Sequence, residues 1–257
     1  MKVKHLVGAF LCVLGCYACS SPKTEVQSPD GHIKMTLTVD ENGKPFYNVS
    51  VDDSLLIENS AMGFTAANGI ILGEGFQVKN TTFSSEDETW TQPWGENKKN
   101  RNHYNEMAVN LTNEDHVQLT LRFRVFDDGI GFRYEYTVPT VDSLLITDEL
   151  TTFRFHRDGT SWSIPASAET YELLYQQQPI SEVETANTPF TFKTADGVYG
   201  SIHEAALYDF PEMTLKQIGH YTLKAELAPW PDGIKARKGN HFTTSWRTVQ
   251  IAPEAVG

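Results

Sequence analysis

The chain has 257 residues, in which 33 Asp and Glu outnumber 21 Lys and Arg, for a formal net charge of −12 at pH 7. This length is enough for one large domain with a sizeable core, and we take one domain as the default. The acidic balance repels phosphate backbones and anionic membrane surfaces, so we predict no nucleic-acid partner. All three cysteines lie at or before position 19, which excludes a disulfide framework and a cysteine-ligated metal site from the rest of the chain.

The N-terminus has the pattern of a bacterial export signal. Lys2 and Lys4 supply positive charge, and the apolar run 6–15 is too short to span a bilayer. Cys16 follows Val-Leu-Gly, as in a lipobox, and Cys19 offers a second, less regular cleavage point. We therefore predict lipidation of Cys16 or Cys19, with an ordinary secretory peptide as the alternative.

The lipobox-like pattern also predicts where the protein resides. A signal peptide over residues 1–19 and a polar linker over residues 20–27 would precede the folded part of the chain. An acyl anchor at that point would make the protein a lipoprotein of the bacterial cell envelope, periplasmic or on the outer membrane. In that case it would contact a membrane only through the anchor.

The rest of the sequence consists mainly of short segments with the pattern of β-strands. Apolar and polar residues alternate over 33–39 and 46–51, and an Asn-Gly pair between them is typical of a tight hairpin. The clearest alternation spans 117–125 and 130–138, joined by an Asp-Asp-Gly turn. Less regular strands are predicted in short pieces over 63–78 and over 143–147, 152–155, 190–194, 198–202, 221–227 and 244–251.

These segments indicate an all-β fold. No apolar period of 3.6 continues for three turns, and strands do not alternate with helices, so a Rossmann fold or a barrel is not supported. At most, 170–176 and 204–207 are predicted to form a helical turn. The number of strands favours a large antiparallel β-sandwich of two sheets over residues 28–257.

The long hairpin also predicts a charged surface. Arg122 and Arg124 alternate with apolar residues on its first strand, and Arg133 and Glu135 do so on its second. On adjacent antiparallel strands such side chains lie opposite one another and pair across the strands. We expect a charged face there rather than a ligand site, because the alternation alone would produce it.

Residues 89–106 show neither a strand nor a helix period, and we predict a long loop. Flat aromatic faces beside amides, carboxylates and an Arg suit a polyol such as a sugar, although a loop that fills the core explains the tryptophans equally well. The candidate ligand-contacting residues are Trp94, Glu96, Arg101, Asn102, His103, Asn105 and Glu106.

Two further segments carry candidate carboxylates. The sequence contains no phosphate-binding glycine loop, HExxH, CxxC or GxSxG motif. Glu169 and Glu172 lie in the aromatic, irregular segment 162–175, where two solvated side chains are the simpler interpretation. His203 and Glu204 end an apolar strand, where burial would shift the pKa of the acid, but a structural hydrogen bond explains the pair equally well.

Four blocks, in order, resemble the N-terminal domain of glycoside hydrolase family 97, and the likeness runs from about residue 28 to residue 251. Several separate blocks make the resemblance more specific than any one alone. The blocks are Trp94-Gly95-Glu96 through Arg101-Asn102-His103-Tyr104-Asn105-Glu106, residues 123–134, residues 202–207, and Ser245-Trp246-Arg247-Thr248.

The resemblance implies a sandwich related to those of galactose mutarotases, followed by a (β/α)8 barrel that carries the catalytic carboxylates. Members of the family are exported, calcium-dependent α-glucosidases and α-galactosidases. By its offset from the block at 162–165, Glu172 matches the one glutamate that the N-terminal domain contributes to the calcium, with Glu169 as the fallback. Calcium takes about six to eight oxygen ligands, so one Glu cannot hold it.

We therefore predict a non-catalytic, carbohydrate-binding domain that flanks the oligosaccharide substrate of an α-glycosidase. Its partner would be the catalytic barrel of the same gene, and calcium would be shared with that barrel. Because glycoside hydrolysis requires two suitably spaced carboxylates, we expect the 257-residue chain alone to be inactive. The alternatives are a free-standing carbohydrate-binding envelope lipoprotein and a sugar mutarotase in which His203 and a Glu act as acid and base.

Overall fold

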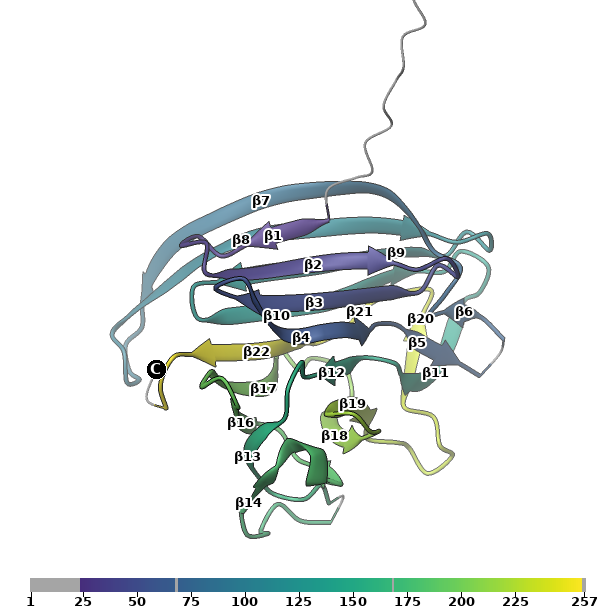
Figure 1. Ribbon diagram of the computed structural model, residues 1–257. Coiled ribbons are helices and arrows are strands. Elements are labelled where there is room, and N and C mark those ends of the chain that lie inside the picture. The colour runs from purple at the N-terminus through teal and green to yellow at the C-terminus, as the bar shows by residue number, and fades with distance from the viewer. Residues whose placement is uncertain (1–23, 68, 168, 256–257) are drawn as a thin grey trace, which may run out of the picture.

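The structure is a computed structural model that describes residues 24–67, 69–167 and 169–255. The predicted signal peptide and both candidate lipidation cysteines, Cys16 and Cys19, lie outside these residues. The described part is almost entirely β (Figure 1), which confirms the predicted all-β class. Its one helical element is a short 3-10 turn, η1 (Ile180–Glu182), and no helix in these ranges is long and apolar enough to cross a bilayer.

The ten-stranded antiparallel sheet is the largest element of the fold. It contains, in spatial order, β14 (Gln176–Pro179), β13 (Gly159–Ser163), β16 (Phe190–Thr194), β17 (Tyr199–Ala205), β22 (Trp246–Ala252), β10 (Gly129–Thr137), β9 (Gln118–Phe126), β8 (Lys99–Thr112) and β7 (Gln77–Thr91), with β21 (His241–Thr243) paired to β10. The predicted long hairpin is the central β9–β10 pair, in register from Phe126↔Gly129 to Gln118↔Thr137.

Three smaller antiparallel sheets complete the described fold. The first, which lies across the large sheet in Figure 1, contains β1 (Glu25–Gln27), β2 (Ile33–Val39), β3 (Pro45–Val51) and β4 (Ser54–Ala61). The second contains β20 (Ala236–Gly239), β11 (Ser143–Glu149), β5 (Phe64–Ala66) and β6 (Ile71–Leu72). The third contains β12 (Thr152–Arg154), β19 (Thr222–Leu227), β18 (Met213–Gln217) and β15 (Thr185–Ala186), and a bridge between Ile57 and Phe155 ties it to the first.

The core lies between the large sheet and the smaller ones, because alternation sends every second side chain of the central strands to that side. On β8, β9 and β10 the residues at alternate positions are fully or almost fully buried. They are Met107, Val109, Leu111, Leu119, Leu121, Phe123, Val125, Ile130, Phe132, Tyr134 and Tyr136. This confirms the predicted large antiparallel sandwich.

Three buried tyrosines bond to backbone or side-chain groups far along the chain. The Tyr47 hydroxyl donates to the Thr152 carbonyl at 2.8 Å, the Tyr136 hydroxyl donates to the Leu72 carbonyl at 2.5 Å, and the Tyr134 hydroxyl lies 2.6 Å from Thr151 Oγ1. A buried phenol without a partner would be costly, so these bonds favour one arrangement of the sheets.

The predicted loop over 89–106 is wrong. Residues 77–112 form the β7–β8 hairpin, and its turn covers only 92–98. Beyond the pair Tyr104↔Phe126 the large sheet gives β8 no second neighbour, so the distal part is a two-stranded ribbon, which Figure 1 shows curving away near the C-terminus. Because both faces of the ribbon are exposed, its strands do not need alternating apolar residues. The sequence over 89–106 therefore shows no strand period.

Two smaller expectations also fail. Neither 170–176 nor 204–207 contains a helical turn: the first is irregular until β14 begins, and the second is the end of β17 followed by irregular chain. Both stretches are too short to pay the cost of helix nucleation without an apolar face to pack. At the N-terminal side, β1 lies inside the segment predicted as a linker and pairs with β2.

Candidate functional site

Two of the predicted ligand-contacting residues, Arg101 and Asn102 on β8, bond to carboxylates of the opposite strand β7. Arg101 donates from Nε and Nη2 to the two carboxylate oxygens of Asp87, at 2.7 and 2.8 Å, and Asn102 donates to Glu88 at 3.0 Å. Trp94, in the turn, is 84% exposed, and Glu96 beside it is exposed as well. The ribbon therefore presents its tip to solvent, while its cross-strand pairs hold its register.

Nearer the sandwich, the side chains of the ribbon face two different hollows. Arg101, Asn102 and His103 line an open hollow of about 580 Å³ beside the turn between β9 and β10. Nδ1 of His103 lies 3.5 Å from Asp127 Oδ2 there. Asn105 points elsewhere, because its Nδ2 donates to the carbonyl of Gln27 at 2.9 Å and it lines another hollow beside β1.

Glu106 lines the hollow beside β1 together with Asn105, and it is also part of the charged face. Its carboxylate accepts from Arg122 Nη1 at 2.5 Å and from Arg124 Nε at 2.8 Å. Glu135 accepts from Arg122 and from Arg133, at distances between 2.7 and 3.1 Å. The predicted cross-strand charged face is confirmed.

Aromatic rings extend this charged face. The guanidinium carbon of Arg124 lies 4.4 Å from the ring centre of Tyr104 and 4.7 Å from that of Trp246, and Arg133 lies 4.8 Å from the same indole. Cations prefer such positions over the electron-rich face of a ring. Although burial opposes ionisation, hydrogen bonds from Arg122 and Arg133 hold the pKa of Glu135 below its ordinary value.

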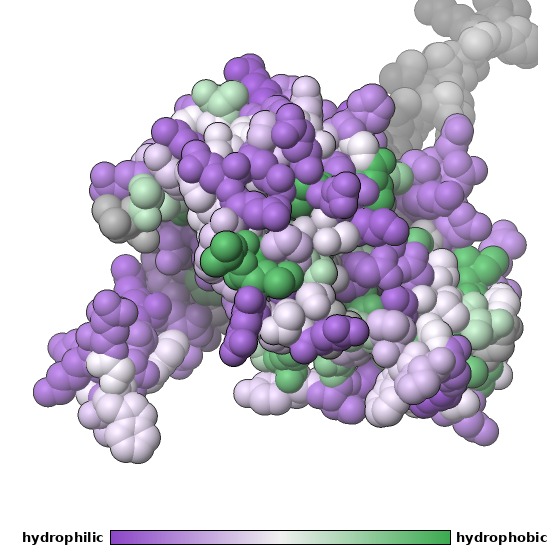
Figure 2. All heavy atoms as spheres, turned by 90° about the horizontal axis from the view of Figure 1, so that it is seen from below, coloured by the Kyte–Doolittle hydropathy of each residue, from purple (hydrophilic) through white to green (hydrophobic). Residues whose placement is uncertain are grey.

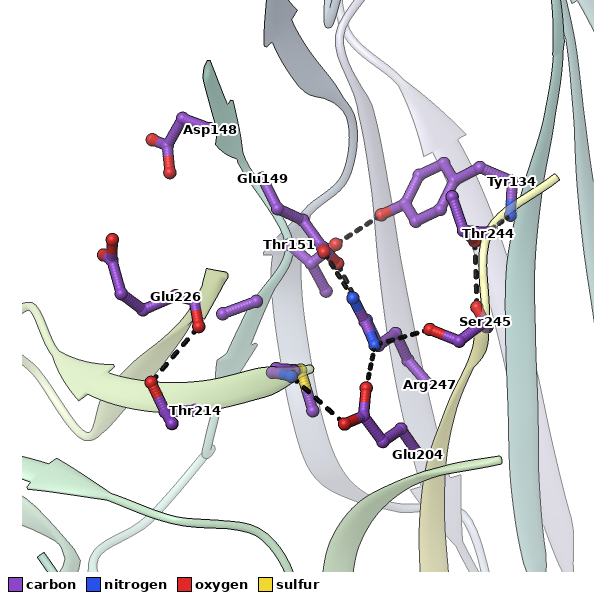
Figure 3. Close-up of polar contacts among 12 residues, drawn as sticks. Tyr134, Asp148, Glu149, Thr151, Glu204, Thr214, Glu226, Thr244, Ser245 and Arg247 are labelled. Carbon is purple, nitrogen blue, oxygen red and sulfur yellow. Dashed lines mark hydrogen bonds and ion pairs between the residues drawn. The ribbon is translucent and has the colours of Figure 1, made fainter. Parts of the chain in front are cut away.

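A second ionic cluster is buried between the layers, around Arg247 of β22 (Figure 3). Its guanidinium donates from Nε and Nη2 to the two oxygens of Glu149 at 3.0 and 2.6 Å, and from Nη1 to Glu204 Oε2 at 2.5 Å. Nη1 also donates to Ser245 Oγ at 2.9 Å. Since Glu149 ends β11 and Glu204 lies on β17, the cluster joins the large sheet to the opposite layer.

The charges in this cluster do not balance, because two carboxylates share one guanidinium. Burial, with the nearby charge of Glu149, raises the pKa of Glu204 above its ordinary value, although Arg247 opposes the shift. Burial disfavours the charge of Arg247, but the two glutamates hold its pKa above the ordinary value, so the guanidinium stays protonated. Glu204 Oε1 accepts from the backbone N–H of Met213 at 3.1 Å, which fixes the start of β18.

A pocket of about 280 Å³ lies next to Glu204, where the irregular segments around Tyr171, Asn187 and Glu212 meet the end of β17. The Tyr171 hydroxyl donates to Glu212 Oε2 at 2.5 Å, and this hydrogen bond raises the pKa of the phenol. Asn187 is 3% exposed, and among the described residues neither its Nδ2 nor its Oδ1 has a hydrogen-bond partner. The pocket thus combines polar groups with an aromatic ring.

His203 lies beside the same pocket, but not on the same face of the sheet as Glu204. It pairs with Thr248 in the ladder, whereas Glu204 pairs with the buried Arg247, so alternation sends the two side chains to opposite faces of β17. Nδ1 of His203 is buried and has no hydrogen-bond partner in the described ranges. This geometry disfavours the use of His203 and Glu204 as a joint acid–base pair on one sugar carbon.

Glu172 lies on the exposed segment between β13 and β14, next to Tyr171. Its backbone N–H donates to Thr170 Oγ1 at 3.0 Å, and its carboxylate faces solvent. Across the described ranges, no group of three or more His, Cys, Asp or Glu side chains could hold a metal ion. A solvent-facing carboxylate suits a calcium ligand by type, but this part of the chain does not supply the remaining oxygens.

The segments around the pocket also expose apolar side chains. Leu174 is 88% exposed and Tyr208 81% exposed, and Tyr171, Leu173 and Leu207 are exposed beside them along the chain. Figure 2 shows hydrophobic side chains at the surface of the lower face of the molecule, among polar ones. Neighbouring exposed apolar side chains of this size mark interaction surfaces more often than isolated ones do.

The structure thus divides the predicted site residues into separate groups. His203, Glu204 and the segment of Glu172 adjoin one pocket, and Arg101, Asn102 and His103 line another hollow. Asn105 and Glu106 line a third hollow beside β1, whereas Trp94 and Glu96 lie at the exposed turn of the ribbon. Sequence reasoning missed the roles of Arg247, Glu149 and Asn187. Only Arg247 could have been recognised from the sequence. It occupies an inward position of an alternating strand, where an unpaired charge would be too costly, so a buried carboxylate partner is expected.

The chain matches the model of a known protein family. The glycosyl-hydrolase 97 N-terminal family model covers residues 26–257. A retaining alpha-galactosidase of Bacteroides thetaiotaomicron is 25% identical over 246 residues, which cover 89% of this chain and 36% of the relative. The chain therefore spans about a third of the length of the curated relative it matches.

Solved structures agree with this match. A glycoside hydrolase family 97 enzyme from Pseudoalteromonas sp. strain K8, solved in complex with acarbose, superimposes with a TM-score of 0.87 at 38% identity, over 90% of this chain and 36% of that one. A beta-arabinopyranosidase superimposes with a TM-score of 0.80 at 20% identity, over 89% of this chain and 40% of that one, which shows a shared fold. The chain belongs to the glycosyl-hydrolase 97 N-terminal family.

Proposed function

We propose that this chain is the non-catalytic, substrate-flanking N-terminal domain of an exported α-glycosidase that acts on an oligosaccharide. The observation that carries the proposal is the family match over nearly the whole chain, combined with relatives about three times as long. The Bacteroides relative is named as an alpha-galactosidase, and the Pseudoalteromonas enzyme was solved with acarbose and with panose. A barrel following this domain would supply the catalytic carboxylates.

The exposed segments around the pocket are the proposed contact with that barrel. Leu174 and Tyr208 leave large apolar areas in water, and covering them would contribute about 1.5–3 kcal/mol for each side chain that becomes fully buried. His203, Glu204 and Glu172 adjoin this same surface. A barrel docked there would place the domain beside a substrate held at the junction.

Calcium is part of the proposal only as a shared ion. Glu172 would supply one carboxylate, and the barrel would supply the other oxygens. When bound, the ion would polarise oxygen atoms of its neighbours and hold the junction together. A single carboxylate leaves most of the shell to water, so the chain alone should bind calcium no more tightly than about 10⁻³ M. Titration calorimetry measures this directly, and micromolar binding would show that the site is elsewhere in the chain.

Export and lipidation remain part of the proposal through the sequence pattern at Cys16 and Cys19. An acyl chain contributes about 0.8 kcal/mol for each buried CH2, which is enough for two or more chains to hold a protein on a membrane. Replacement of both cysteines by serine should release the protein from the membrane fraction. Retention of the double variant in that fraction would contradict the anchor.

The experiment that tests the function is a hydrolysis assay on the purified 257-residue chain. We expect no release of p-nitrophenol from α-glucosides or α-galactosides, with or without calcium. Glu149 and Glu204 are held by Arg247, and neither is free to act as nucleophile or acid. Turnover that co-purifies with the protein through successive columns would overturn the assignment of a non-catalytic role.

A further inference from the structure

The buried carboxamide of Asn187 requires an explanation. The residue follows β15, its backbone N–H donates to the Ile164 carbonyl at 2.9 Å, and it is only 3% exposed to solvent. An amide offers two donors and one acceptor, and each buried polar group left without a partner costs about 1–3 kcal/mol. A group maintained at that cost beside a pocket points to a polar occupant.

The groups around Asn187 restrict what the occupant can be. The carboxylate of Glu212 shares its Oε2 with the Tyr171 hydroxyl and keeps Oε1 available, while both oxygens of Glu204 are engaged at the base. Two carboxylates and neither Lys nor Arg line the described pocket, which disfavours an anion. The occupant must therefore offer donors to Glu212 and both a donor and an acceptor to Asn187. Hydroxyl groups on neighbouring carbons do this.

The shape of the pocket fits a ring with an apolar face. Tyr171 is 56% exposed and Leu207 43% exposed, and both line the pocket. A volume of about 280 Å³ is at the small end of ligand pockets, enough for one sugar ring but not for a whole oligosaccharide. An aromatic side chain at the rim offers its face to the C–H side of such a ring.

We propose that this pocket binds one neutral sugar unit of an oligosaccharide, with Asn187 and Glu212 bonding to adjacent hydroxyls and Tyr171 packing on the ring. The choice of an oligosaccharide rests on the proposed function, but every contact comes from this chain. Binding should therefore be measurable without a catalytic barrel. Hydrolysis by the isolated chain would overturn the proposed function, whereas absence of sugar binding would overturn the present proposal, so the two can fail independently.

The test is saturation-transfer NMR and titration calorimetry on the full 257-residue chain, with panose and stachyose as probes. We expect weak binding, with a dissociation constant on the order of 1 mM, for at least one of them. Asn187→Leu is nearly isosteric and removes the unpaired groups, so it should weaken binding about tenfold or more without lowering thermal stability. If neither panose nor stachyose binds at concentrations up to roughly tens of millimolar, the proposal is wrong.

Two surface variants keep the test decisive if Asn187→Leu folds poorly. Tyr171→Ala removes the ring at the rim, and Glu212→Gln removes the negative charge and replaces one acceptor oxygen by an NH2 donor, so each should weaken binding at least about threefold. Tyr208→Ala is the matched control, because Tyr208 is an exposed tyrosine on the neighbouring segment and does not line the pocket. Equal affinity of Tyr171→Ala and the control would show that the sugar binds elsewhere and would overturn the assignment of this pocket.

Discussion

At the scale of single residues, Arg247 holds the two layers of the sandwich together. Its side chain is fully buried and bonds to Glu149 from one layer and to Glu204 from the other. A buried ion pair is not by itself evidence of high stability, because desolvation offsets much of the attraction. Once the carboxylates are buried, however, removing their only guanidinium leaves both without compensation.

We therefore predict a large effect for Arg247→Leu. The substitution should lower the free energy of unfolding by about 3–5 kcal/mol, since it leaves uncompensated buried charge. Urea denaturation followed by circular dichroism measures the change. Arg101→Ala is the control, because the pair of Arg101 with Asp87 is more than half exposed and should contribute under about 1 kcal/mol. Similar losses in the two variants would contradict the structural role assigned to Arg247.

Glu135 gives the corresponding prediction for pH. Its pKa is lowered from the ordinary 4.5 in the folded protein, so its contribution to stability is present above that value and is lost as pH falls through the folded pKa. Glu135→Gln should lower the free energy of unfolding by about 1–2 kcal/mol at neutral pH, and the difference from wild type should shrink below pH 4.5. A difference that stays constant from pH 7 to about pH 3 would contradict this linkage. Glu96→Gln, at the exposed turn, is the control.

At the scale of elements, the β7–β8 ribbon shows where sequence periodicity stops being informative. Strands with one buried face, such as β9 and β10, were predictable because burial imposes a period of two on their side chains. The ribbon beyond Tyr104 has no buried face, and its strands are held by backbone pairing and by cross-strand contacts such as Arg101 with Asp87. Such contacts leave no apolar pattern in the sequence.

The ribbon should therefore be dispensable for folding. Replacing residues 88–102 by an Asn-Gly turn would connect Asp87 to His103, which are paired in the ladder, so the remaining hairpin keeps its register. We expect a loss of less than about 2 kcal/mol in the free energy of unfolding, because the deleted residues are mostly exposed. Denaturation of the shortened protein measures this, and loss of cooperative unfolding would show that the ribbon is part of the folding unit.

At the scale of the whole molecule, the sequence was sufficient for the all-β class, the central hairpin and the family. Most strands of the chain have one face covered by another sheet, and their apolar residues alternate with polar ones. This alternation predicts the layered core. The pocket could not be predicted, because Asn187 and Tyr171 come together only through the pairing of β13, β15 and β17 with distant strands. Nothing in the local sequence of Asn187 distinguishes it from an exposed turn residue.

The central claim, that this domain is inactive alone and serves a catalytic barrel, is tested most directly by a domain exchange. Residues 26–257 would replace the matching N-terminal region of the Pseudoalteromonas enzyme, with which they share 38% identity. We predict that the isolated chain hydrolyses no α-glucoside or α-galactoside, that the folded chimera does, and that Glu172→Gln in the chimera raises the calcium concentration needed for half-maximal activity by about tenfold or more. Hydrolysis by the isolated chain, or a folded chimera without activity, would contradict the account.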